Sequence, residues 1–444
     1  MKTGAIVKVK LAAMNYLEFA VWGAYLTSLG TFLWNKGMES NIGIFYAIQG
    51  IVSLFMPAVI GIIADKYIQA QRMLSICHFI AGAFMIGAGF YAATSGDDIQ
   101  FGPLFVLYSI SVGFYMPTIG LANSIAYTTL NKYNLDTIKH FPPIRVFGTV
   151  GFICAMLFVN FTGFQNTYNQ LFTSGVLSII LAFYALTLTK CPINKSAGKK
   201  SFVQTLGLDA FKLFKDKQMA LFFIFSMFLG VSLQITNGFA NPFIKGFAEI
   251  QEYSSTWGAN NANAIISLSQ MSETLCILLI PFFLRRYGIK VVMAMSMFAW
   301  VFRFGFFGIG NPGDGVWLFV LSMIVYGIAF DFFNVSGSLY VDRKTNPSMR
   351  SSAQGLFMIM TNGLGATIGV LAAQAVIDNY VTCAATPAEK VEGWHTSWLI
   401  FAAYALVVSV LFLLVFKYKH NPNESSVSTD VIEEDLDAPD GMIK

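Results

Sequence analysis

Residues 315–338 read GVWLFVLSMIVYGIAFDFFNVSGS, an apolar run with a single acidic residue, Asp331, near its centre. A membrane span needs about 20 apolar residues, and comparable runs recur along the whole chain. Lipid offers no hydrogen-bond partner to the backbone, so each run is expected to be an α-helix. The pattern predicts an all-α membrane protein with twelve spans, near residues 11–33, 42–64, 73–93, 101–127, 142–163, 168–189, 219–245, 262–284, 290–309, 315–338, 351–377 and 395–416.

The composition agrees with a chain that is dissolved in lipid. Of its 444 residues, 55% are hydrophobic and 12% are charged, and the mean hydropathy is +0.61. Soluble proteins carry about 25% charged residues, so a soluble enzyme, a secreted disulfide scaffold and a disordered chain are excluded. The net charge of +4 favours no nucleic-acid partner. The spacing of Cys and His predicts no metal site and no cofactor.

One long polar stretch divides the spans into six plus six. The predicted domains are an N-terminal six-helix half at 1–189, a cytoplasmic linker with an interfacial helix at 190–218, a C-terminal six-helix half at 219–420 and a disordered acidic tail at 421–444. Most Lys and Arg residues lie in loops on the side of the termini, which predicts that both termini are cytoplasmic. Two similar halves are typical of secondary transporters, whose sites lie near the membrane midplane.

A short basic loop follows the second span, and a similar one follows the eighth. The first has the pattern Gly-x-x-x-Asp-Lys-x-x-x-x-x-Arg, which includes Asp65 and Arg72. This pattern resembles the loop signature of the major facilitator superfamily. We expect Asp65 and Arg72 to form a cytoplasmic latch between helix ends, with ordinary solvated loop charges as the alternative.

Five ionisable residues fall inside the spans, where a charge is costly and usually serves a function. Burial disfavours the charged form of a carboxyl group, so Asp331 and Glu273 are candidates for reversible protonation. Arg303 lies toward the outer end of its span, where its long side chain can reach the membrane surface. The five residues are Glu18, Arg145, Glu273, Arg303 and Asp331.

Polar and aromatic side chains share helical faces with these charges. Gln234 and Asn237 stand three positions apart on one span, and Gln270 and Glu273 do so on the next. Amides can donate and accept hydrogen bonds, and aromatic rings stack on flat groups. The set suits a neutral polar ligand with hydroxyl groups and a flat ring, whereas polar contacts that only join helices are the alternative.

Several segments resemble the nucleoside:proton symporters of the major facilitator superfamily. Matching stretches include FPPIRVFGT at 141–149, LQITN at 233–237, SQMSET at 269–274 and LSMIVYGIAFDFFN at 321–334. The resemblance runs from residue 11 to about residue 420. It implies a major facilitator fold and proton-driven import of purine and pyrimidine nucleosides across the bacterial inner membrane. It also implies a substrate site made of Arg145, Thr149, Phe152, Gln234, Asn237, Gln270, Glu273, Phe330 and Asp331.

The resemblance suggests how proton and nucleoside are coupled, and one residue departs from it. A proton on Asp331 or Glu273 and a bound nucleoside would favour the same loaded carrier, which then reorients. Glu18 stands where the family pattern has a neutral Gln. Three roles are open to it: a second protonation site, a ligand contact, or a carboxylate paired with Arg145. We expect the carrier to be a monomer.

Two other functions compete with this interpretation. A proton-coupled sugar or oligosaccharide carrier of the same fold would use the same amides and carboxylates, because ribose is itself a sugar. A membrane-embedded enzyme would need a cluster of metal-binding aspartates or a catalytic histidine at a span end. The sequence has no DDxxD-type run, so we expect a transporter and not an enzyme.

Overall fold

The computed structural model describes residues 2–192, 208–346 and 349–418, in which every regular element is a helix. Nine helices in this part of the chain are long and apolar enough to span a membrane. One of the nine, α11 (Ala262–Ile309), turns sharply at Gly288 and provides two spans. With α1 (Lys2–Gly23) and the shorter apolar α7 (Asn169–Ala185) this gives twelve. The predicted all-α, twelve-span fold is therefore confirmed.

The N-terminal group of helices packs around α1 and α4. Helix α1 lies against α6, and α4 lies against both α5 and α7. The first predicted span, 11–33, is divided between α1 and α2 by a turn at 24–28. The other elements of this group are α2 (Leu29–Trp34), η1 (Glu39–Asn41), α3 (Ile42–Lys66), α4 (Ala70–Ser95), α5 (Phe101–Lys132), α6 (Thr137–Phe161) and η2 (Phe164–Asn166).

The C-terminal group packs around α11, which lies against α12 and α15, while α9 lies against α14. Its eleventh span is interrupted by a π-helical segment, η6, between α13 and α14. The elements are η3 (Leu208–Lys215), α9 (Lys217–Gly246), η4 (Phe247–Glu249), α10 (Trp257–Asn260), α11, α12 (Val316–Lys344), α13 (Arg350–Met358), η6 (Ile359–Gly365), α14 (Ala366–Ile377), η7 (Asp378–Thr382) and α15 (Pro387–Val415).

The turn inside α11 depends on a glycine. Gly288 has φ 76° and ψ 170°, a conformation that is essentially restricted to glycine because a side chain there would clash with the backbone. It lies in the basic loop 284–290 that the sequence places between the eighth and ninth spans. The loop can thus reverse the chain within a few residues, which lets the two spans lie side by side.

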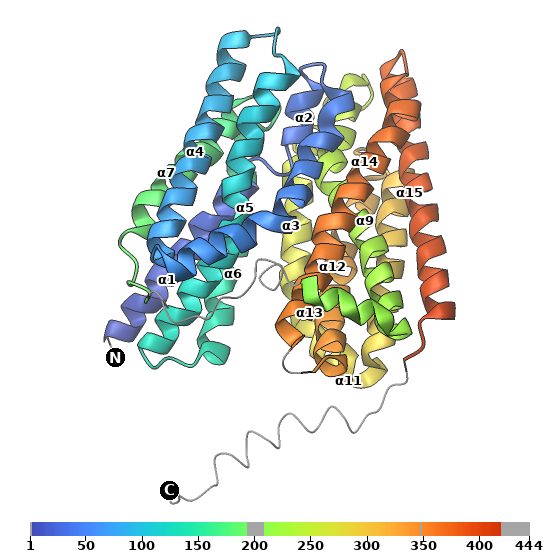
Figure 1. Ribbon diagram of the computed structural model, residues 1–444. Coiled ribbons are helices and arrows are strands. Elements are labelled where there is room, and N and C mark those ends of the chain that lie inside the picture. The colour runs from blue at the N-terminus through green and yellow to red at the C-terminus, as the bar shows by residue number, and fades with distance from the viewer. Residues whose placement is uncertain (1, 193–207, 347–348, 419–444) are drawn as a thin grey trace, which may run out of the picture.

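The two groups of helices stand beside each other (Figure 1), and side-chain hydrogen bonds join them at one end. Thr31 donates to Asn241 Oδ1 (2.5 Å), Thr27 donates to Asn263 Oδ1 (2.9 Å), and Asn241 Nδ2 donates to the same oxygen (2.6 Å). We call these four residues the polar clasp. Helix α1 begins, and α15 ends, at the opposite end of the molecule (Figure 1).

Most of the other hydrogen bonds between the two groups also lie at the end of the molecule that holds the clasp. Asn160 donates to Asn261 (2.8 Å), and the backbone N–H of Gly43 donates to Gln374 (2.7 Å), both near the clasp. In the part of the chain that the structure describes, such bonds lie at the clasp end or midway along the helices. The structure is therefore closed at the clasp end.

The predicted linker is described only in part. Its residues 208–215 form η3, in which Ala210 is buried and the Phe214 ring packs against Phe223 of α9 at 5.4 Å between centroids. Residues 193–207 of the linker and the predicted tail at 421–444 lie outside the described residues. The division into domains stays a prediction.

Candidate functional site

Arg145 on α6 interacts with residues of both groups of helices. Its guanidinium carbon lies 3.9 Å from the ring centroid of Phe19 on α1, a cation–π contact that stabilises a desolvated charge. Gly148, one turn further along α6, makes the room for this contact. A Cβ atom there would lie 2.7 Å from the Phe19 ring and 2.8 Å from Nη1 of Arg145. The guanidinium also interacts electrostatically with Glu273 of α11, in the other group.

Two carboxyl groups interact electrostatically with each other, and one of them, Glu273, also interacts with this arginine. They belong to Glu273 on α11 and Asp331 on α12. Asp331 is only 6% exposed, and among the described residues its Oδ2 has no hydrogen-bond partner. An unpaired buried carboxyl oxygen is costly, so it is well suited to bind a proton or a ligand hydroxyl. We call Arg145, Glu273 and Asp331 the central charge group.

The two predicted amides on α9 contact each other. Asn237 Nδ2 donates to Gln234 Oε1 at 2.9 Å, and Gln234 Nε2 reaches the backbone oxygen of Tyr46 on α3 at 3.5 Å. The pair therefore lies where the two groups of helices meet. Within the described residues no hydrogen bond joins it to the central charge group, so a ligand would have to link them.

The aromatic candidates are each held by a second ring. Phe152 on α6 is buried and meets Trp22 edge-on, with 6.2 Å between centroids. Phe330 on α12 stacks on Tyr326 with parallel planes at 5.8 Å. Trp22 and Tyr326 were not predicted as part of the site. Tyr326 stands four positions before Phe330, so helical spacing was a signal that could have found it.

The two remaining candidates are half-buried on the helices that carry the charges. Thr149 lies on α6, one turn after Arg145, and Gln270 lies on α11, one turn before Glu273. Their positions agree with the predicted helical faces. Neither side chain makes a described contact with the central charge group.

Arg303 corrects an expectation from the sequence. It does not reach the membrane surface, since it is 2% exposed. Its Nη1 donates to the backbone oxygen of Ser322 at 2.8 Å, and its guanidinium carbon lies 4.4 Å from the Tyr326 ring centroid. Inside the protein, a backbone carbonyl and an aromatic ring therefore interact with the guanidinium in place of water. Arg303 supports the ring on which Phe330 stacks.

Glu18 is buried in the N-terminal group of helices. Its Oε2 lies 2.8 Å from Nε2 of His78 on α4, and Thr118 on α5 donates to its Oε1 at 2.6 Å. Hydrogen bonding thus pairs it with His78, and Arg145 only interacts with it electrostatically. His78 was missed because a lone histidine in an apolar span carries no spacing signal. We call these two residues the Glu18–His78 pair.

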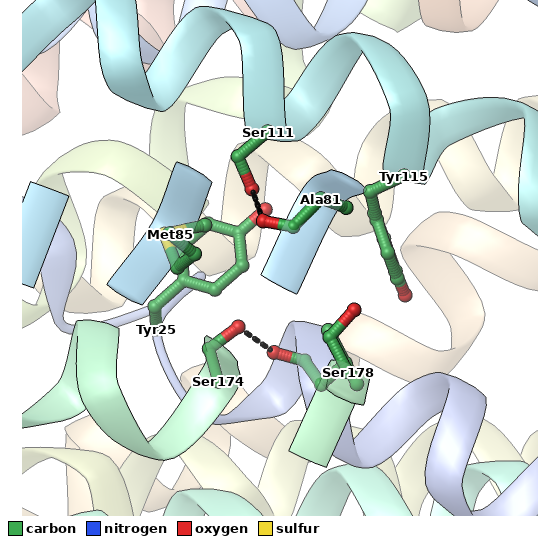
Figure 2. A pocket seen from close by; sticks show the side chains of 8 residues that line it. Tyr25, Ala81, Met85, Ser111, Tyr115, Ser174 and Ser178 are labelled. Carbon is green, nitrogen blue, oxygen red and sulfur yellow. Dashed lines mark hydrogen bonds between the residues drawn. The ribbon is translucent and has the colours of Figure 1, made fainter. Parts of the chain in front are cut away.

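A small pocket adjoins this pair and is separate from the central charge group. Figure 2 shows its hydroxyl-bearing lining, which includes Tyr25, Ser111, Ser174 and Ser178. The Ser111 hydroxyl donates to the backbone oxygen of Ala81 at 2.7 Å. The pocket is too narrow for a nucleoside, so it is not the predicted substrate site.

The predicted latch is only half visible. Arg72 is exposed in the first turn of α4. The side chain of Asp65 lies outside the described part of the structure. The latch between Asp65 and Arg72 therefore stays a prediction.

The family of the chain follows from comparison with known proteins. The model of a family described as "Nucleoside H+ symporter" matches residues 5–421. The chain belongs to the nucleoside H+ symporter family. The resemblance noted in the sequence is thereby confirmed, and as a member of this family the chain is a multi-pass membrane transporter and not an enzyme.

Two curated relatives from Escherichia coli (strain K12) cover nearly the whole chain. A xanthosine permease is 44% identical over 421 residues, which is 94% of this chain and 98% of that protein. The nucleoside permease NupG is 44% identical over 417 residues, covering 93% of this chain and 97% of its own length.

Solved structures agree with this membership in the family. The crystal structure of the nucleoside transporter NupG superposes with a TM-score of 0.84 at 44% identity, covering 93% of this chain and 100% of that one. A D-xylose–proton symporter superposes with a TM-score of 0.62 at 12% identity, covering 92% and 97%. That more distant likeness concerns the fold alone, the two-half fold of the major facilitator superfamily.

Proposed function

We propose that this symporter imports nucleosides together with protons, through a site between its two groups of helices. The observation that carries the proposal is the placement of the central charge group. Arg145 approaches from α6, while Glu273 and Asp331 approach from α11 and α12. The names of the xanthosine and nucleoside permeases support nucleosides as the substrate class. The proposal covers both purine and pyrimidine nucleosides.

The chemistry of the site suits the two parts of a nucleoside. The amides of Gln234 and Asn237 can both donate to and accept from ribose hydroxyl groups. The flat base would stack on Phe152 or Phe330, whose rings are already held in place by other rings. Further contacts are proposed from Arg145, Thr149, Gln270, Glu273 and Asp331.

Proton coupling is proposed to run through the carboxyl groups of the site. Asp331 or Glu273 takes up a proton from outside, since burial disfavours the charged carboxylate. The neutral acid can then donate a hydrogen bond to the nucleoside. Proton and nucleoside favour the same loaded state, which reorients and releases both to the more alkaline cytoplasm.

The orientation in the membrane follows from the charged loops. Loops on the side of the termini are rich in Lys and Arg, which supports the proposal that this side faces the cytoplasm at a bacterial inner membrane. In this orientation the polar clasp would face outward, and the structure would represent a state closed to the outside. The proposed carrier acts as a monomer built from halves 1–189 and 219–420, with the Asp65–Arg72 latch on the cytoplasmic side.

Uptake into proteoliposomes tests this function. With an inward proton gradient, purified protein should accumulate labelled uridine and adenosine, and dissipation of the gradient should abolish accumulation. Unlabelled nucleosides should compete, and free ribose should not. Equal competition by ribose would instead identify a sugar carrier. Accumulation that does not depend on the proton gradient would contradict proton symport.

A further inference from the structure

The Glu18–His78 pair is sealed inside the N-terminal group of helices. Both side chains are 0% exposed, and Oε2 of Glu18 lies 2.8 Å from Nε2 of His78. The pair connects α1 with α4, and Thr118 and Ser178 extend it to α5 and α7. A carboxyl group and an imidazole are both titratable, yet the proposed substrate site uses neither of them.

The geometry of the pair requires one shared proton. Two unprotonated atoms, a carboxylate oxygen and an imidazole nitrogen, would present lone pairs to each other at 2.8 Å. A proton between them turns this contact into a charge-assisted hydrogen bond. When His78 is neutral and supplies this proton as Nε2–H, the pair carries the −1 charge of the carboxylate; a second hydrogen, on Nδ1, gives the loaded form of the pair, which is neutral overall.

The neighbouring hydroxyl groups satisfy this loaded form. Thr118 donates to Oε1 of Glu18 at 2.6 Å. The Ser178 hydroxyl lies 2.9 Å from Nδ1 of His78 and donates at 2.9 Å to the backbone oxygen of His78, so its oxygen is free to accept from Nδ1–H. Every polar atom of both side chains thus has a partner, which is what a stably buried pair needs.

Among the described residues, Arg145 is the cation that interacts electrostatically with the pair. Glu18 interacts electrostatically with Arg145 on α6, with Tyr115 on α5 and with Cys77 on α4. Tyr115 also donates to the backbone oxygen of Glu18 at 2.8 Å. From α7, the hydroxyl group of Ser178 contacts His78. Arg145 is therefore the charged group that responds to the state of the pair.

We propose that the Glu18–His78 pair is a second proton-binding site of the transporter, separate from the carboxyl groups of the substrate site. The proposal rests on the proton-coupled function proposed above. Loading adds one H⁺ to the pair and takes its charge from −1 to zero. Release returns that H⁺ to water and leaves a carboxylate, which requires α1 and α4 to expose the contact in another state of the cycle.

Arg145 links this site to the substrate site. It interacts with Glu18 and with Glu273 and stacks on Phe19, the residue next to Glu18. When the pair is loaded and neutral, the guanidinium is attracted mainly by Glu273. When the proton leaves, the carboxylate of Glu18 competes for it. Proton release at the pair therefore changes the charge balance around a bound nucleoside.

Glu18→Gln tests the second site, because the amide keeps hydrogen-bonding groups but cannot titrate. In proteoliposomes we expect the number of protons moved per nucleoside to fall by one, and the pH profile of uptake to lose one titrating step. Exchange of nucleoside without a gradient should continue. A wild-type proton-to-nucleoside ratio together with a wild-type pH profile would overturn the proposal.

A second variant covers the case in which Glu18→Gln does not fold. His78→Gln removes the imidazole from the pair, so the pH profile of uptake should change. An unchanged pH profile in His78→Gln would equally overturn the proposal.

A matched control removes a carboxylate elsewhere. Asp97 is exposed outside the spans and pairs with Lys36 at 2.8 Å. The hydrogen bond and charge of Lys36 hold the pKa of Asp97 below its usual range, so it stays ionised throughout the assay. Asp97→Asn should keep the wild-type ratio. If the wild type itself shows no proton-driven uptake, the proposed function fails; if only Glu18→Gln behaves as wild type, the second site alone fails.

Discussion

Asp331 combines burial with an oxygen that has no partner in the described structure. If this oxygen takes up the coupling proton, Asp331→Asn removes the titration but retains the shape of the side chain. We expect the variant to lose gradient-driven accumulation and to retain some nucleoside exchange. Counterflow and uphill uptake, measured in the same proteoliposomes, separate the two activities. Wild-type accumulation by Asp331→Asn would remove this residue from coupling.

The amide pair on α9 makes a separate prediction about affinity. Asn237→Ala removes one ribose partner and also the donor to Gln234 Oε1. Loss of a hydrogen bond to a buried polar group costs about 1–3 kcal/mol, so nucleoside binding to the purified variant should weaken by that amount in calorimetry. Gln218→Ala, on the same helix but bonded to the backbone of Lys417, should bind as wild type. Equal affinities in both variants would place Asn237 outside the site.

Single residues of the site could be predicted where the sequence shows a charged side chain inside an apolar span, because burying that charge is costly. Asp331 and Glu273 stood out because an acid in an apolar run has few structural explanations. His78 did not stand out, because its contact with Glu18 joins two helices and leaves no local spacing. Tyr326 stands four positions before Phe330 on α12, so its helical spacing could have identified it.

The membrane-spanning helices were predicted more completely than the breaks within them. Runs of about 20 apolar residues locate spans well, since lipid imposes a length on each of them. The break between α1 and α2 and the π segment η6 lie within such runs. Both breaks contain polar residues, Thr27 and Ser28 in the first and Thr361 and Asn362 in the second, but each break lies inside an apolar run that is long enough for one span.

The turn at Gly288 allows a prediction about stability. A side chain in this backbone conformation costs about 1–3 kcal/mol, so Gly288→Ala should lower the thermal unfolding temperature of the purified protein. Gly305, on the same long helix α11, has helical geometry and open space around it. Gly305→Ala should leave the unfolding temperature unchanged or raise it. Equal melting of Gly288→Ala and wild type would show that the loop relaxes without strain.

At the scale of the whole molecule, transport requires the clasp end to open and close. Thr31→Cys combined with Asn241→Cys places thiols on both groups of helices, where the native side chains are 2.5 Å apart. A short thiol cross-linker should then stop transport, and a reducible linker should restore it on cleavage. We expect the same loss of uptake in every labelled molecule, because the closed end can no longer admit substrate.

A cross-link within one group provides the control. Ser28 donates to Gln170 of α7 at 2.9 Å, at the same end of the molecule but inside the N-terminal group. Ser28→Cys with Gln170→Cys should therefore cross-link and still transport. Continued transport by the cross-linked Thr31–Asn241 variant would show that the two groups do not separate at this end.

The clasp is built from hydroxyl and carboxamide groups, and none of its four members carries a net charge. Mobile ions in the medium shield attraction between charges over about 8–10 Å at ordinary ionic strength, but they act little on neutral dipoles. Opening of the clasp end should thus depend little on the ionic strength of the medium, in dilute and in saline surroundings alike.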